Sequence, residues 1–192
     1  MKFKYPGRGG YREGAGRPKK PGAGVPHRPR APLKARHPVH VTLRVRDDVA
    51  NLRSRACFLA IARALAEGRE RFGLGLVHFS VQANHVHFIA EADDQDALAR
   101  GMQGLGVRAL NRVLGRSGKV FADRYHAHVL RSPREVKNAV AYVVGNAIIH
   151  AARRGERVHP DAIDPMSSAW ERDIVVQPRT WLLRWGWLRA VP

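Results

Sequence analysis

The sequence predicts an α+β domain: a ferredoxin-like antiparallel sheet of βαββαβ order, with helices on one face and one further helix after the last strand. Three observations predict it. Alternating apolar and polar residues mark strands near 39–46, 74–82, 85–91 and 125–131. Helical apolar periodicity marks 50–72 and 94–114. A capping box with proline at 132–135 starts a last helix that is predicted to run to about residue 154.

Residues 1–36 precede the first strand and are rich in Gly, Pro, Arg and Lys, so a disordered basic arm is predicted there. Arg17, Lys19 and Lys20 belong to a Gly-Arg-Pro-Lys-Lys segment similar to the core of an AT-hook. Minor-groove reading and a plain electrostatic tether both stay open, and the tether is favoured. Residues 37–155 are predicted to form the folded domain. Residues 156–192 are then an extension that packs on the domain or contacts DNA.

The strands differ between their two faces. Val39, Val41 and Leu43 alternate with polar residues in the first strand. On the second strand Val77, Phe79 and Val81 are predicted to share the apolar face, after a helix whose end is marked by Gly73 and Gly75. The opposite face would display His40, Thr42, Arg44, His78, Ser80, Gln82, His85 and His87. So many polar groups predict a site on this face rather than a second core.

The last helix is predicted to be buried by Val136, Ala139, Val140, Val143, Val144 and Ala147. Tyr142 and Asn146 are four residues apart and therefore share one face of this helix. That face lies about a third of a turn from the apolar stripe. We expect both side chains just outside the packing surface, close to His85 and His87 if the helix packs on the polar face of the sheet.

His85 and His87 are separated by one apolar residue on a predicted strand, so both imidazoles point to the same face. Such a pair is a half-site for a divalent metal. His126 and His128 form a second pair that could replace or join the first. Tyr125 is a rival to Tyr142 as a nucleophile, although a core position or a phosphate contact is favoured for it.

The charge of the chain indicates a polyanionic partner. Lys and Arg outnumber Asp and Glu by 34 to 16, giving a net charge of +18 and a pI near 11.4. Nucleic acid is favoured over an anionic membrane surface, because the chain has neither a spanning apolar run nor a signal-peptide core. The single cysteine, Cys57, suits a reducing cytoplasm. We therefore expect a cytoplasmic, nucleoid-associated protein, monomeric or homodimeric.

Three segments carry a resemblance to a known family: Asn84-His85-Val86-His87-Phe88, Asp123-Arg124-Tyr125-His126, and 141–146 with its Tyr142 and Asn146. In order and spacing they resemble single-tyrosine transposases of the HUH superfamily, with the REP-associated tyrosine transposases as the nearest branch. The resemblance covers roughly residues 37–155. Relatives often have proline after the position of Asn146, where this chain has Ala147.

The resemblance implies a transposase that cuts and rejoins single-stranded DNA near hairpins. Tyr142 would be the catalytic nucleophile that forms a 5′-phosphotyrosine link. His85, His87 and Asn146 would bind Mg²⁺ or Mn²⁺ as the metal ligands. A non-catalytic nucleic-acid-binding regulator and a replication- or conjugation-type nickase are the alternatives.

DNA contacts are expected from basic residues in the arm and around the site. These are Arg17, Lys19, Lys20, Arg44, Arg112, Arg116, Lys119, Arg124, Arg131 and Arg134. Trp181, Trp185 and Trp187, with Arg184, could stack on unpaired bases, but packing of the tail onto the domain is favoured.

Overall fold

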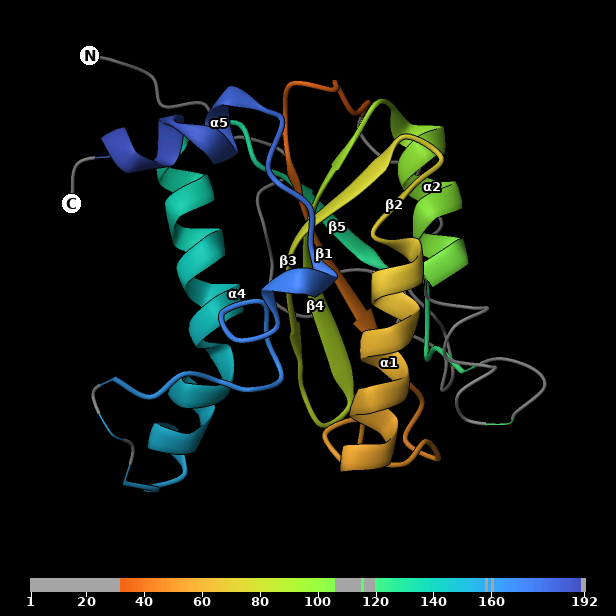
Figure 1. Cartoon of the computed structure of the whole chain (residues 1–192), viewed down its shortest axis with the longest axis vertical. Coiled ribbons are helices and arrows are strands. Elements are labelled where there is room, and N and C mark those ends of the chain that lie inside the picture. Colours follow the sequence, from red (N-terminus) through yellow and green to blue (C-terminus); the bar gives the residue numbers. More distant parts are fainter. Residues whose placement is uncertain (1–31, 106–114, 116–119, 158, 160, 191–192) are drawn as a thin grey trace, which may run out of the picture.

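A computed structural model describes residues 32–105, 115, 120–157, 159 and 161–190. It confirms the α+β class and the antiparallel sheet (Figure 1). Five strands lie in the order β2-β3-β4-β1-β5. Their bounds are β1 Val39–Arg44, β2 Glu70–Arg71, β3 Leu74–Val81, β4 His85–Ala92 and β5 His126–Val129. Without the short β2, this is the predicted split order, with β4 and β5 flanking β1.

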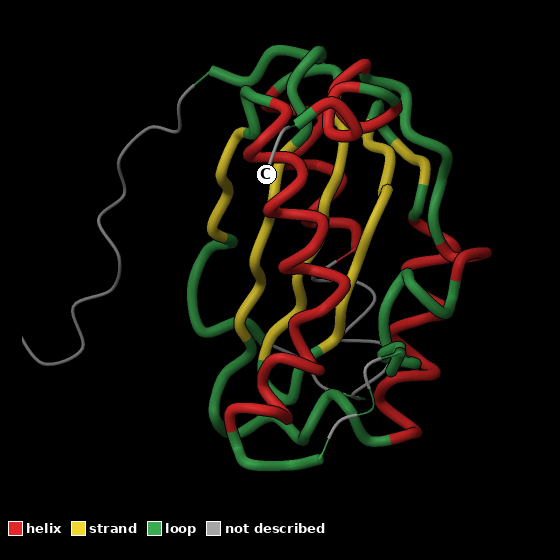
Figure 2. Tube along the Cα trace, turned by 90° about the vertical axis from the view of Figure 1, so that its left-hand side faces the viewer, coloured by secondary structure: helices red, strands yellow, loops and turns green. Residues whose placement is uncertain are grey.

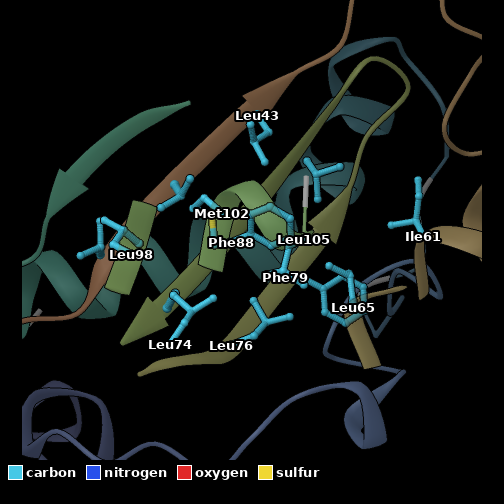
Figure 3. Packing of buried hydrophobic residues seen from close by; sticks show 14 of the residues in the cluster. Leu43, Ile61, Leu65, Leu74, Leu76, Phe79, Phe88, Leu98, Met102 and Leu105 are labelled. Atoms are coloured by element: carbon cyan, nitrogen blue, oxygen red, sulfur yellow. The ribbon is translucent and has the colours of Figure 1, made fainter. Parts of the chain in front are cut away.

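Helices cover both faces of the sheet. α1 (Arg55–Gly68) and α2 (Gln95–Gln103) lie on one face, and α4 (Pro133–Arg153) lies along the other, as Figures 1 and 2 show. The larger core fills the space between the sheet and α1 and α2 (Figure 3), with Phe79 and Phe88 at its centre. The helix that follows the last strand therefore packs on the face that carries the histidines.

The α4 face of the sheet is partly apolar, which corrects the prediction of a purely polar face. Its second core consists of Val77, Ile89, Leu130, Val136, Ala139, Val143, Leu182 and Leu183. Val77 lies on this face because the pairing of β3 with β4 shifts between Leu76 and His78. Such a bulge reverses the facing of the residues on one side of it. The prediction that Val77 shares a face with Phe79 and Val81 was wrong for this reason.

Two boundaries of the first helical segment also differ from the prediction. The chain turns at Asn51, whose side-chain oxygen accepts the backbone N–H of Arg53, and α1 begins only after the N-cap Ser54. After α1, β2 and β3 are joined by Phe72 and Gly73, both in the left-handed region with φ of 56° and 77°. Gly73 therefore forms a hairpin turn rather than the end of a helix.

Helices α2 and α4 begin at the predicted caps. Asp94 accepts the backbone N–H of Ala97 at the start of α2. Ser132 and Glu135 exchange side-chain-to-backbone hydrogen bonds at the start of α4, a complete capping box. The predicted continuation of α2 to residue 114 lies outside the described residues.

The segment after residue 160 runs back along the sheet. It contains η2 (Arg172–Ile174), α5 (Trp181–Arg184) and η3 (Gly186–Arg189). Asp164 is fully buried and forms a two-point ion pair with Arg53, at 2.7 and 3.0 Å. Further along, the buried carboxylate of Glu91 on β4 accepts the backbone N–H groups of Arg179 and Thr180, both at 2.7 Å. Among the described residues, none of the helices has the length and apolarity of a membrane span.

Candidate functional site

His85 and His87 lie at the start of β4, on the face covered by α4. Their neighbours Val86 and Phe88 point into the larger core, so the strand's alternation fixes both imidazoles on one side. The two Nε2 atoms are 3.0 Å apart. The Nε2 atoms of the two rings therefore point toward the same position.

The opposite nitrogen of each ring is held by a neighbour. The side-chain oxygen of Asn84 accepts a hydrogen bond from Nδ1 of His85 at 2.8 Å. Nδ1 of His87 lies 3.1 Å from the hydroxyl of Thr42 and 3.2 Å from Nε2 of His40, both on β1. Because Asn84 takes the Nδ1 proton, Nε2 of His85 presents a lone pair to the shared point.

Tyr142 and Asn146 of α4 complete the group. The Tyr142 ring packs edge-on against His87 and His40, with centroids 5.2 and 5.9 Å away. Tyr142 keeps 43% of its surface exposed, whereas Asn146 is 1% exposed. Asn146 thus occupies a core position beside Val143 and not the expected place outside the packing surface.

The amide of Asn146 is unusual for a buried group. Among the described residues, neither its nitrogen nor its oxygen has a hydrogen-bond partner. A buried polar group without a partner costs about 1–3 kcal/mol of stability. Such a cost at a position that a leucine could fill indicates a group kept for a reason other than folding.

His150 is a site residue that the sequence reasoning missed. It follows Tyr142 and Asn146 by one further helical turn, and its charge is one cause that lowers the pKa of both His85 and His87. The four-residue spacing of positions 142, 146 and 150 on one helix was the available signal. Because positions 142, 146 and 150 recur at four-residue intervals, Asn146 lies on the same stripe of α4 as Tyr142.

Burial keeps the histidines neutral. Loss of hydration, together with a smaller contribution from neighbouring histidines, lowers the pKa of His87 to about 3 and that of His40 to about 4. The pKa of His85 is also lowered, first by burial and then by the charges of His150 and Arg44. At neutral pH these rings therefore carry lone pairs and no charge, the form in which imidazole binds a metal.

The donor set can be tested against a divalent metal. Two ligands about 2.1 Å from an octahedral ion and at right angles to each other are about 3.0 Å apart, which is the separation of the two Nε2 atoms. Within the part of the chain that the structure describes, no group of three His, Cys, Asp or Glu side chains could hold a metal ion. A third protein ligand would have to be of another type, and the orphaned amide of Asn146 is suited to that role.

The second histidine pair lies on the same face of the sheet as the first, two strands away. His126 and His128 lie on the edge strand β5, opposite Thr42 and His40 of β1, and both are exposed. His128 is 3.6 Å from the carboxylate of Glu135, which gives it another partner. Tyr125 lies against the core on the α1 and α2 side of the sheet, away from this group.

The predicted DNA-contacting residues are placed in part. Arg44 lies opposite His85 in the register of β1 and β4, and its side chain is exposed. Its guanidinium nitrogen is 3.3 Å from a carboxylate oxygen of Asp47. Arg131 and Arg134 are exposed at the start of α4, and Arg124 is exposed shortly before β5. Six others lie outside the described residues: Arg17, Lys19, Lys20, Arg112, Arg116 and Lys119.

Comparisons with known proteins support the fold. No family model matches the chain, and no curated protein matches it by sequence. Among solved structures, a REP-associated tyrosine transposase bound to a REP hairpin is similar, with a TM-score of 0.56 and 15% identity. The match covers 66% of this chain and 74% of that one. At this identity the likeness establishes a shared architecture.

Proposed function

We propose that this chain is a transposase: a metal-dependent, single-strand-specific DNA endonuclease and strand-transferase with Tyr142 as its nucleophile. One observation carries the proposal. A half-exposed phenol packs against two converging neutral imidazoles, and an orphaned buried amide lies one helical turn from the phenol. The fold shared with a transposase that binds a DNA hairpin supports the same conclusion.

In this proposal His85, His87 and Asn146 hold one Mg²⁺ or Mn²⁺. The ion would withdraw charge from the scissile phosphate and orient it for in-line attack. Asn84 keeps the lone pair of His85 on Nε2. The Thr42 hydroxyl can accept as well as donate, so it can receive the Nδ1 proton of His87 and leave that Nε2 free as well.

Tyr142 performs the covalent step. Its phenolic oxygen attacks the phosphorus and gives up its proton to solvent, and the bond from phosphorus to the 3′ oxygen breaks. The leaving oxygen takes up a proton and becomes a free 3′-OH, while the 5′-phosphate stays on Tyr142. Because the phosphodiester energy is kept in the new ester, a 3′-OH can later attack it and restore a DNA strand without any other energy source.

The environment of Tyr142 suits this step. The ring is held by His40 and His87 on one side, while 43% of its surface remains open to a substrate. Arg44, Arg131 and Arg134 are exposed on the elements that build the site, and we assign them to phosphates of the bound strand. The proposed substrate is single-stranded DNA beside a hairpin.

The test is a denaturing gel of protein incubated with end-labelled single-stranded hairpin DNA from its genomic flanks, with Mg²⁺ or Mn²⁺. We expect a metal-dependent covalent adduct that disappears in Tyr142→Phe and in His85→Ala. Tyr125→Phe is the matched control and should keep the adduct. Loss of the adduct in Tyr125→Phe with retention in Tyr142→Phe would overturn the assignment. Tight binding without any adduct would identify a non-catalytic DNA-binding regulator.

A further inference from the structure

The C-terminal segment carries an exposed aromatic surface that the proposed chemistry does not use. Trp181, Trp185 and Leu188 are 52%, 55% and 62% exposed. These are three of the nine large apolar residues that are exposed in the described part of the chain, and they fall within eight positions. Isolated exposed apolar side chains are ordinary, but a concentration of large ones marks an interaction site.

The aromatic rings stand on a rigid base. Leu182, Leu183 and Trp187 point the other way and pack with Val143 of α4 in the second core. Trp181 is fixed further by Gly186, where an added Cβ would lie 2.6 Å from the indole ring. The segment is also held through the two hydrogen bonds to Glu91 described above. A surface held in this way is preorganised for a ligand.

The same surface is positively charged. The Arg184 guanidinium lies 5.7 Å from the centre of the Trp185 ring, and that of Arg189 lies 6.0 Å from the Trp181 ring. Residues 174–192 contain three arginines and no acidic residue. Trp181, Arg184, Trp185 and Arg189, here called the Trp–Arg surface, thus combine flat apolar faces with cations. This combination fits bases that have left a stack, together with their phosphates.

The Trp–Arg surface lies beside the nucleophile's helix. The Lys137 ammonium in the second turn of α4 donates to the carbonyl of Ala190 at 3.0 Å, and η3 packs against the same helix. Tyr142 follows Lys137 by five residues, a rise of about 8 Å along the helix axis. Five residues also rotate the helix by about 140°, so a strand bound at Tyr142 would reach these rings by running partly around α4, over a few nucleotides.

We propose that the Trp–Arg surface binds the unpaired bases of single-stranded DNA next to the reactive phosphate, by stacking them on Trp181 and Trp185. This inference rests on the proposed function for its substrate class. It adds a second contact region, which recognises unpaired bases and not the sequence at the cut site. Charge complementarity favours DNA over a second protein copy as the occupant.

The test measures binding alone, with the full-length Tyr142→Phe protein in EDTA, so that cleavage plays no part. The probes are a fluorescent hairpin with a single-stranded flank and the same hairpin with blunt ends, followed by anisotropy. We expect Trp185→Ala to weaken binding of the flanked hairpin by about 5-fold to 150-fold, the range for one lost base stack. Binding of the blunt hairpin should stay unchanged, and Trp185→Phe should retain most of the affinity.

Trp170 provides the matched control, because it is 64% exposed and lies before η2, outside the Trp–Arg surface. Trp170→Ala should bind both hairpins as the parent does. Equal losses of Trp185→Ala on flanked and blunt hairpins, or no loss on either, would overturn the proposal. So would a parent protein that dimerises in sedimentation and becomes monomeric in Trp185→Ala, since the surface would then be a protein interface. If no covalent adduct forms but the protein still binds the flanked hairpin more tightly than the blunt one, only the cutting mechanism is refuted.

Discussion

Replacing Asn146 by leucine should stabilise the protein while abolishing its proposed chemistry. Asn146 is 1% exposed on the buried face of α4, and both polar atoms of its amide lack a hydrogen-bond partner among the described residues. In ordinary cores such a position is filled by an apolar residue. The substitution therefore tests whether Asn146 is present for stability or for the proposed activity.

The expected gain is the sum of two favourable contributions and one unfavourable one. Removing the unpartnered amide recovers about 1–3 kcal/mol, and burying a leucine side chain adds about 1.5–3 kcal/mol. Fitting the bulkier side chain beside the histidines costs about 1–3 kcal/mol. The net expectation is a rise of about 2 kcal/mol in the free energy of unfolding. For a chain of 192 residues this corresponds to a Tm increase of about 4–8 °C.

The assay is thermal and urea unfolding of the metal-free protein at neutral pH, followed by circular dichroism. Asn138→Leu is the control, because Asn138 lies exposed on the same helix and shares the gain in helix propensity. The difference between the two variants isolates the buried amide. A Tm of Asn146→Leu at or below that of Asn138→Leu would refute the reasoning, because the amide would then have partners that folding needs. The parent should be stabilised further by Mn²⁺, and Asn146→Leu should lose that response.

Three more outcomes follow from the same structure. Arg53→Met should lower the free energy of unfolding in urea by about 3–5 kcal/mol, because it leaves the carboxylate of Asp164 buried without its cation. The control Arg63→Met, on the exposed face of α1, should change it by less than about 0.5 kcal/mol. Burial lowers the pKa of His78 to about 4, below its value in the unfolded chain. The stability that this residue contributes is therefore full above pH 6.5 and is lost as the pH falls toward 4. The free energy of unfolding of the His78→Gln protein should depend less on pH over this window, and an unchanged slope would exclude His78 as a cause. Thr42→Val should weaken Mn²⁺ affinity, measured by calorimetry, by about 10-fold to 100-fold, and an unchanged affinity would show that the Thr42 hydroxyl does not position His87.

Local patterns in the sequence were enough for the elements of the fold. The capping box at Ser132 and the cap at Asp94 place helix starts correctly, because each cap is satisfied within a few residues of itself. Strand alternation likewise fixes His85 and His87 on one face. The βαββαβ order of elements then implies the antiparallel sheet that the structure confirms.

The tertiary structure decided what meets on that face. The bulge after Leu76 depends on how β3 pairs with β4, and it turned Val77 toward α4, giving the histidine face a small core of its own. That core holds α4 in the position where Tyr142 reaches His87 and where Asn146 is buried.

From the sequence alone, Tyr142 and Asn146 could be assigned to one side of a helix and His85 and His87 to one side of a strand. Their meeting, the contribution of His150 and the fixing of the tail by Glu91 depend on residues far apart in the chain. Periodicity is a property of neighbours along the chain, whereas a site is made by long-range packing. The sequence therefore determined the parts of this site, and only the packed domain determined their arrangement.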